Sequence, residues 1–337
     1  MRSDAIDPAS FGVPGGLTSR KFWRQAGATN EMFRDGRLLN VGGTAYALPG
    51  VLESPESIAR LVGALAPEGS VVTGWAAALL HGVRDAGPTM LRTAGSPVQI
   101  CLDRHDHRVP PGFTTLRVTL DADDIERIDG LSATTPARTA YDMARFSGSL
   151  AFAVSLLDAF ACELNPQPIQ LGDLAQLRAR RPRGKGHPLL RSAEPLVSPR
   201  ARSMTESRLR VRVLRTLDLM PHDLGVNVFM RGISQPWELD LIDWSSGLVL
   251  EYDSVHHAST EQRERDALKD LEVHELGLER LRINSITLGK PDYEFAALVR
   301  RARLKARSVG AEERAAELRS DGRLSELPLR RYESAVG

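Results

Sequence analysis

Residues 248–257 read LVLEYDSVHH and place chemically active side chains on a strand-like apolar pattern. Glu251 and Asp253 are two positions apart, and the run ends in His256 and His257. Side chains two positions apart on a strand share one face, about 6.6 Å from each other. Oxygen-rich sites of this kind favour Mg²⁺ or Mn²⁺. The stretch therefore indicates a candidate metal site.

The preceding strand-like run, ELDLIDW, adds a third carboxylate. If residues 244–247 form a hairpin loop, Asp243 pairs with Leu248 and Asp240 lies opposite Glu251. Directly opposed residues have Cβ atoms about 4.5–5.5 Å apart. The other face of the hairpin would carry an apolar stripe of Leu239, Leu241, Leu248, Leu250 and Tyr252.

Carboxylates gathered in this way repel each other by roughly 3 kcal/mol per pair at about 5 Å and an effective dielectric of 20. A shared proton, an arginine partner or a divalent cation would relieve the repulsion. Alternatively, the polar face is solvent-exposed and the charges are screened. The spacing alone leaves these alternatives open.

The elements that must position these acids occupy residues 203–308, in the predicted order αβββαβα. Ser203 and Glu206 form a capping box at the start of a helix that ends near Leu217. Three strand-like runs follow, NVFMRG, ELDLIDW and LVLEYDS. A helix over 259–277, a strand at LERLRINS and a final amphipathic helix complete the order.

These motifs together resemble the nuclease-like domain of very-short-patch-repair endonucleases, within the PD-(D/E)XK fold. The resemblance implies a restriction-endonuclease-like αβββαβ core that hydrolyses DNA with Mg²⁺ or Mn²⁺. It assigns metal binding to Asp240, Glu251 and Asp253. The catalytic set that it implies is Glu206, Asp240, Glu251, Asp253 and His257.

The sequence departs from the family pattern at two positions. The third motif position, a lysine in PD-(D/E)XK enzymes, is Asp253, so His257 or a helix residue such as Lys269 would have to take its role. Ser254 stands where glycine is usual. An inactive descendant that serves as a DNA-binding scaffold is therefore an alternative to an active enzyme.

Residues 17–50 predict two short helices and a hairpin, the order of a winged helix-turn-helix. Thr18 or Ser19 can cap a helix that ends at Gly27, and Thr29 can cap a second that ends at Gly36. Any small helical hairpin would give the same pattern. The proposed phosphate contacts are Arg20, Lys21, Arg24, Arg34 and Arg37.

The stretches LTSRKFWRQAGAT, GRLLNVGGTAYALPG, GWAAALLHGV and TTPARTAYDMAR resemble the AbiEi-type antitoxin, a winged-helix repressor. The resemblance covers most of residues 17–145. It implies a DNA-binding regulator with a toxin as its partner.

Positive charge is concentrated between Gln176 and Arg215, where twelve Arg or Lys residues accompany two acids. Proline and glycine interrupt this run. It could contact DNA phosphates or be a solvated linker. The residues proposed to contact DNA here are Arg180, Arg181, Arg183 and Lys185.

The composition of the 337 residues, 42% hydrophobic and 26% charged with a net charge of +1, is that of a globular protein. No apolar run of about 18 residues and no signal-peptide order occur, so a cytoplasmic protein that does not enter membranes is expected. The predicted class is α/β (α+β). The expected segments are a leader (1–16), a winged helix (17–50), a mixed α/β region (51–165), a basic linker (166–202), a nuclease-like domain (203–308) and a tail (309–337).

The sequence thus predicts a DNA-binding protein and, as its main interpretation, a Mg²⁺-dependent DNA endonuclease or nickase. In that interpretation the metal would activate water, and His257 would position or deprotonate it. The alternative is a non-catalytic transcriptional regulator that keeps an inactive nuclease fold. A homodimer and a toxin or mobile-element partner are left open.

Overall fold

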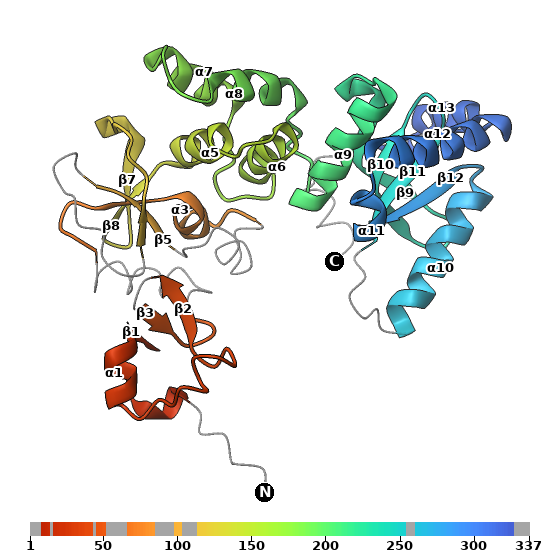
Figure 1. The fold of residues 1–337 in the computed structure, drawn as a ribbon. Coiled ribbons are helices and arrows are strands. Elements are labelled where there is room, and N and C mark those ends of the chain that lie inside the picture. The colour runs from red at the N-terminus through yellow and green to blue at the C-terminus, as the bar shows by residue number, and fades with distance from the viewer. Residues whose placement is uncertain are drawn as a thin grey trace, which may run out of the picture. The chain divides into compact units, whose positions relative to one another are not determined.

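The computed structural model describes residues 8–13, 16–42, 45–51, 66–84, 98–102, 113–253 and 260–326. The chain forms two compact units. The N-terminal unit comprises residues 1–143 and 165–182, and the C-terminal unit comprises residues 144–164 and 183–337. Each unit has its own β-structure and helices (Figure 1).

The first part of the N-terminal unit is a three-stranded antiparallel sheet with one short helix. Its elements are a 3₁₀ helix (Pro8–Phe11), β1 (Leu17–Ser19), α1 (Arg20–Gln25), β2 (Leu39–Gly42) and β3 (Ala45–Ala47), with the strand order β1-β3-β2. The predicted cap at Ser19 is confirmed, because its hydroxyl accepts the Phe22 N–H (3.3 Å). Buried Trp23 donates its indole N–H to the Tyr46 carbonyl (2.8 Å), which fixes α1 to the sheet.

The second helix expected between Thr29 and Gly36 does not form. The Thr29 hydroxyl accepts the Met32 N–H (3.5 Å), yet residues 30–34 are turns. A segment this short depends on tertiary packing, and here Met32 and Leu38 pack with Trp23 in the small core of this part of the chain. The chain instead turns back, and the Leu38 N–H donates to the Met32 carbonyl (2.9 Å). Only one of the two helices of the predicted winged helix-turn-helix is present.

The second part of the N-terminal unit is a five-stranded mixed sheet with the order β6-β5-β4-β8-β7. Its strands are β4 (Val71–Thr73), β5 (Val98–Cys101), β6 (Phe113–Thr115), β7 (Ile125–Ile128) and β8 (Leu131–Thr134). The apolar helix α3 (Gly74–Leu80) packs on it, and a 3₁₀ helix (Ala122–Asp124) precedes β7. His81 is buried and contacts the Thr134 carbonyl (2.8 Å).

Two helices lie near the limits of the N-terminal unit. α5 (Pro136–Arg145) crosses the boundary between the two units, and α7 (Leu171–Arg180) belongs to the N-terminal unit. The Pro/Gly-containing stretch 181–186 separates α7 from α8 (His187–Ala193), so the segment expected as a basic linker is largely helical.

The C-terminal unit contains the predicted αβββαβα order. After α6 (Leu150–Ala161), α8 and a 3₁₀ helix (Glu194–Leu196), it comprises α9 (Met204–Leu217), a 3₁₀ helix (Pro221–Asp223), β9 (Leu224–Arg231), β10 (Pro236–Asp243), β11 (Leu248–Asp253), α10 (Thr260–Glu275), β12 (Glu279–Asn284), α11 (Ser285–Leu288), α12 (Asp292–Ser308), α13 (Ala311–Ser320) and β13 (Leu324–Ser325). The sheet order is β12-β11-β10-β9-β13, with β12 parallel to β11 and the other pairs antiparallel.

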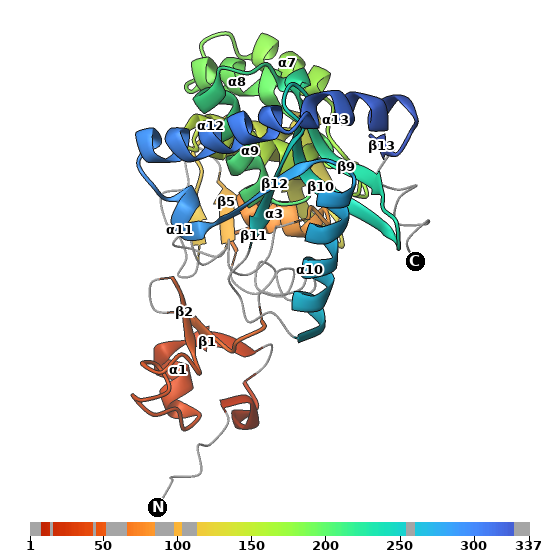
Figure 2. The ribbon, with the colours of Figure 1, turned by 90° about the vertical axis from the view of Figure 1, so that its right-hand side faces the viewer.

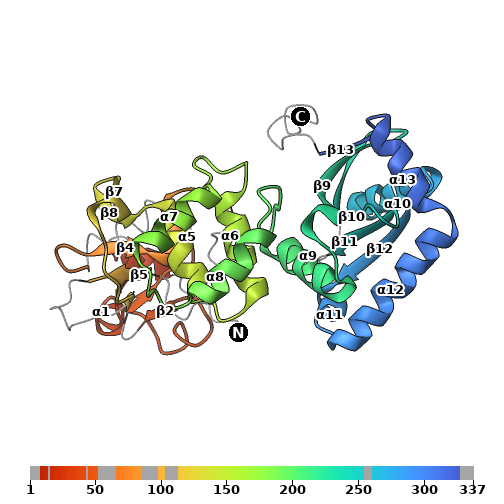
Figure 3. The same ribbon diagram turned by 90° about the horizontal axis from the view of Figure 1, so that it is seen from above.

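Both faces of this sheet are covered by helices (Figure 3). One core joins α9 and α12 to Leu241, Leu248 and Leu250, and the other joins α10 and α13 to Ile242 and Val249. The alternative of a fully solvent-exposed polar face is therefore wrong for this hairpin.

The predicted leucine stripe is interrupted at Asp240. Leu241 belongs to the α9/α12 core, whereas Leu239 belongs to the α10/α13 core. Between the paired residues Leu239–Val228 and Leu241–Val226, the ladder has no Asp240 pair. Asn227, which would face Asp240, has a positive φ of 46°. This irregularity shifts the neighbouring side chains to opposite cores.

Helix α13 lies in the segment expected as a tail (Figure 2). Ala315 and Leu318 are fully buried in the second core. The hairpin turn touches this helix, because a Cβ at Gly247 (φ 66°) would collide with the Ala311 carbonyl. No helix of the described part of the chain is long and apolar enough to span a bilayer.

Candidate functional site

The β10–β11 hairpin has the register expected from its sequence. Leu241 pairs with Leu250 and Asp243 with Leu248, so the same register places Asp240 opposite Glu251. The loop is residues 244–247, as predicted. The two acids therefore lie at the point where the regular ladder ends.

Asp240 takes the place of a backbone acceptor in the sheet. Its Oδ2 accepts the Tyr252 backbone N–H (2.9 Å). Burial raises the pKa of Asp240, while this hydrogen bond and the nearby Lys269 act in the opposite direction. The side chain is thus fixed by the neighbouring strand.

Glu206 lies in the first turn of α9, and half of the predicted capping box forms: the Ser203 hydroxyl accepts the Glu206 N–H (3.2 Å), while the Glu206 carboxylate takes other donors. Ser203 donates its hydroxyl to Oε1 (2.9 Å), while Asn227 Nδ2 (3.1 Å) and the Arg202 backbone N–H (3.3 Å) donate to Oε2. Burial raises the pKa of Glu206 to about 7, and the charge of Asp240 adds to the rise. Glu206 can therefore hold a proton near neutral pH, which relieves its repulsion from Asp240.

Glu251 is only 5% exposed and contacts two cations. Lys269 from α10 approaches Oε1, and Arg280 from β12 approaches Oε2. Lys269 also donates to the Glu238 carbonyl (2.5 Å). Burial lowers the pKa of Lys269, and it lowers the pKa of Arg280 to about 10. The predicted relief by a basic partner is thus the one observed at Glu251.

Asp253, the remaining acid of the predicted ligand set, is exposed at the end of β11. His257, the predicted catalytic histidine, lies outside the described residues. Among the residues that the structure describes, no group of three or more His, Cys, Asp or Glu side chains is placed to hold a metal ion. With Lys269 and Arg280 on Glu251, these residues as placed do not fit Mg²⁺ or Mn²⁺ at that carboxylate.

Two members of the cluster, Glu238 and Arg280, were not predicted from the sequence. Glu238 forms an ion pair with Arg202 (2.8 Å), and burial raises its pKa. Glu238 is two positions before Asp240, the same spacing as between Glu251 and Asp253. The rule that side chains two positions apart share one strand face could therefore have predicted it. Arg280 could not be found in this way, because its place depends on the parallel pairing of β12 with β11.

The proposed DNA contacts of residues 17–50 fall into two groups. Arg20 (3.4 Å) and Arg24 both donate to the Asn30 side chain, and Arg37 forms an ion pair with Asp35 (2.7 Å). Two further residues, Lys21 and Arg34, are exposed and make no ion pair or side-chain hydrogen bond within the described segments. These two have the basic groups most available to a ligand.

The basic residues at the end of α7 and just after it divide in the same way. Arg181 contacts Asp121 (2.6 Å) and Asp124, and Arg180 lies 3.5 Å from Asp124. Arg183 and Lys185 are exposed, and the described residues offer their side chains no such partner. Of the four residues predicted to contact phosphates in this segment, two therefore have intramolecular partners.

The pKa of Glu206 gives a pH-dependent prediction for stability. A carboxyl whose pKa is higher in the folded than in the unfolded state keeps its proton up to a higher pH in the folded state. The free energy of unfolding therefore falls as pH rises from about 4.5 to about 7. For Glu206 the loss is expected to be about 2–3 kcal/mol. The variant Glu206→Gln should remove most of this slope and be the more stable protein at pH 8, measured by urea unfolding with EDTA present.

The matched control is Glu264→Gln, a change on the exposed surface of α10. It should leave the pH dependence of unfolding as in the wild type. An unchanged slope in Glu206→Gln would show that this carboxyl does not carry the shift.

The fold and the site define a mixed α/β chain with a neutralised acidic cluster in its C-terminal unit. Residues 70–192 match the family model of the AbiEi antitoxin C-terminal domain. This match confirms in part the antitoxin resemblance of residues 17–145 and reaches into the basic segment. No curated protein matches the chain. No solved structure matches it either.

Proposed function

We propose that the protein is a DNA-binding regulator of the antitoxin type, the alternative that the sequence raised beside the nuclease. The observation that carries the proposal is the match of residues 70–192 with the AbiEi antitoxin C-terminal domain. An antitoxin acts with a toxin, so DNA and a toxin protein are the proposed partners. Cytoplasmic localisation follows from the same proposal.

The basic residues of the three-stranded sheet and α1 support DNA contact in the N-terminal unit. Lys21 is exposed on α1, and Arg34 is exposed in the turn that leads to β2. Exposed basic groups without intramolecular partners can exchange counterions for DNA phosphates at little structural cost. Phosphate contacts of this kind position a protein on DNA and carry no sequence information themselves.

The test is the salt dependence of DNA binding by Lys21→Ala/Arg34→Ala. Each lost phosphate contact lowers the slope of log K against log[salt] by about 0.9, so this variant should lose up to about 1.8. Fluorescence anisotropy with a duplex from the region upstream of the protein's own coding sequence would measure the slope. Arg37→Ala, whose guanidinium is held by Asp35, should change it less.

An unchanged slope in the double variant would remove these residues from the interface. Absence of any binding by the wild-type protein, in buffer with EDTA and at low salt, would contradict the proposed function as a whole.

Under this proposal the acidic cluster has a structural role. Glu251 is compensated by Lys269 and Arg280, and Glu206 by hydrogen bonds from Ser203 and Asn227. A buried acidic cluster that is compensated within the protein needs no metal ion for stability. DNA binding should then require no divalent cation.

The second candidate is the DNA endonuclease or nickase of the main sequence interpretation. The observation that favours it is the αβββαβ order around Glu206, Asp240 and Glu251, with a raised pKa at Glu206 and Asp240. A strongly perturbed carboxyl pair is a frequent feature of functional sites. This candidate would need Glu251 to exchange its cationic partners for Mg²⁺ or Mn²⁺. Cleavage of plasmid DNA that Asp240→Asn abolishes would favour it over the regulator.

A further inference from the structure

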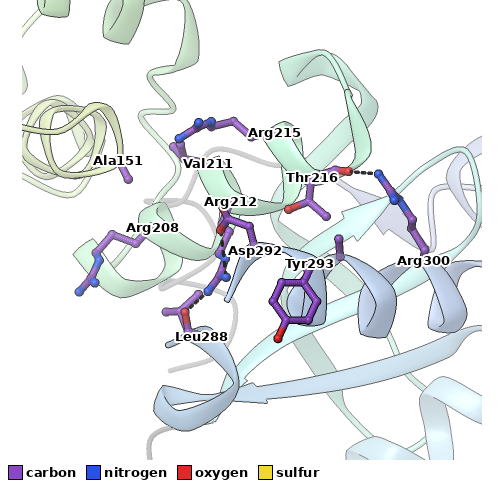
Figure 4. Close-up of a pocket in the computed structure, with 11 residues that line it drawn as sticks. Ala151, Arg208, Val211, Arg212, Arg215, Thr216, Leu288, Asp292, Tyr293 and Arg300 are labelled. Carbon is purple, nitrogen blue, oxygen red and sulfur yellow. Dashed lines mark hydrogen bonds and ion pairs between the residues drawn. The ribbon is translucent and has the colours of Figure 1, made fainter. Parts of the chain in front are cut away.

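A basic groove lies on the C-terminal unit between α9 and α12. Its lining includes no residue of the acidic cluster and none of the DNA contacts proposed above. Its volume is about 540 Å³. Four arginines, Arg208, Arg212, Arg215 and Arg300, line it, and Asp292 is the one acid among the lining residues (Figure 4). The groove therefore carries three more positive than negative side chains.

The arginines of α9 share one face of the helix. Arg208, Arg212 and Arg215 are spaced i, i+4 and i+7, so they follow the same side over two turns. The core-facing side of α9 carries Leu209 and Val213, which are fully buried. The amphipathic pattern of α9 thus fixes the three arginines at the surface.

Two of the groove arginines are held by the protein. Arg212 donates to the carbonyls of Leu288 and Lys290, contacts Asp292 (3.2 Å) and lies 4.2 Å from the centre of the Phe295 ring. Arg300 donates to the Thr216 carbonyl (3.1 Å). Because Asp292 pairs with Arg212, it leaves the remaining arginines of the groove uncompensated.

Arg208 and Arg215 are the available pair. Both are exposed, and within the described segments neither makes an ion pair or a side-chain hydrogen bond. Two turns of helix separate them by about 10.5 Å along the axis. Ala151, in the first turn of α6, also borders the groove, so the positive end of that helix dipole adds to the field.

We infer that this groove binds the phosphodiester backbone of duplex DNA, as a second contact surface of the protein. Guanidinium groups match phosphate oxygens with paired hydrogen bonds. A separation of about 10.5 Å equals the rise of about three nucleotides along one strand, so both arginines can reach one DNA backbone. The inference rests on the proposed DNA-binding function and assigns part of it to the C-terminal unit.

The test compares two variants that lose the same charge. Arg208→Gln/Arg215→Gln removes the available pair, and Arg231→Gln/Arg301→Gln removes two exposed arginines of the same unit that do not line the groove. The full-length proteins are titrated with a 30-base-pair duplex at several salt concentrations. The groove variant should bind about tenfold or more weakly at low salt and lose up to about 1.8 from the salt slope. The control variant should stay within about twofold of the wild type.

Inorganic tripolyphosphate, titrated by calorimetry, distinguishes a DNA site from a site for small polyanions. If the groove variant lost tripolyphosphate binding but bound DNA as tightly as the control variant, the groove would be a site for small polyanions and the inference would be overturned. Equal DNA affinity of the groove and control variants would overturn it as well, and the proposed function would stand. Failure of the wild-type protein to bind any duplex would reject both.

Discussion

The variant Asp124→Ala is expected to lose about 3–5 kcal/mol of the free energy of unfolding of the N-terminal unit. Asp124 is fully buried and contacts Arg138 (2.5 Å), Arg181 and Arg180 (3.5 Å). Arg138 is itself only 1% exposed, with Asp142 as its other acidic partner at 2.7 Å. Removing one carboxylate therefore leaves a buried guanidinium undercompensated. Urea unfolding followed by hydrogen exchange of α5 peptides would measure the loss.

The neighbouring acid provides the control. Asp123 also faces Arg180, at 3.6 Å, but its side chain is 86% exposed. Asp123→Ala should change the stability by less than about 0.5 kcal/mol, since an exposed ion pair is screened by solvent. Equal effects of the two alanine variants would mean that the arginine cluster does not stabilise this unit.

Glu251→Gln is expected to destabilise the C-terminal unit by about 3–5 kcal/mol, because it leaves Lys269 and Arg280 without their shared carboxylate. The sign of the change in stability distinguishes Glu251→Gln from Glu206→Gln. Glu206 has a raised pKa, so its neutralisation should stabilise the protein at pH 8. The measurement is urea unfolding of both glutamine variants in EDTA at that pH.

Asp270→Asn is the matched control for Glu251→Gln. Asp270 contacts the same Arg280, yet its side chain is 48% exposed, and its loss should cost less than about 1 kcal/mol. If Glu251→Gln instead stabilised the protein without metal ions, Glu251 would be a repelled carboxylate of the kind that a cation site contains. The compensation by Lys269 and Arg280 would then be refuted.

Local sequence rules predicted the elements of the C-terminal unit well. The cap at Ser203 and the four-residue loop at 244–247 depend on residues close in the chain, and both form as expected, although the Glu206 carboxylate does not complete the capping box. The interruption of the leucine stripe at Asp240 was not predictable from alternation alone. It arises from the positive φ of Asn227 on the adjacent strand.

Local rules failed to predict the structure of two segments. Residues 29–36 have a cap and a stop signal, but they form turns that bury Met32 beside Trp23. Helix α13 has few large apolar residues, and its stability comes from burial of Ala315 and Leu318 under the sheet. Tertiary packing decides both cases.

The candidate site was predictable mainly in its hairpin acids. The grouping of Asp240 and Glu251 follows from one hairpin, whereas the cations that contact Glu251 come from α10 and β12. The same holds for Arg181, which lies 60 positions from its partner Asp121. A basic run read along the sequence cannot show which of its charges are neutralised by distant acids.

The most direct test of the proposed regulatory function is DNA binding and DNA integrity measured on the same samples. The wild-type protein is incubated with a supercoiled plasmid that contains the region upstream of its own coding sequence, in EDTA and in Mg²⁺ or Mn²⁺. Electrophoresis before and after removal of the protein separates binding from cleavage. We expect retarded, intact plasmid in all three buffers. Nicked or linear plasmid in the metal buffers, lost in Asp240→Asn, would contradict a non-catalytic regulator and establish the nuclease.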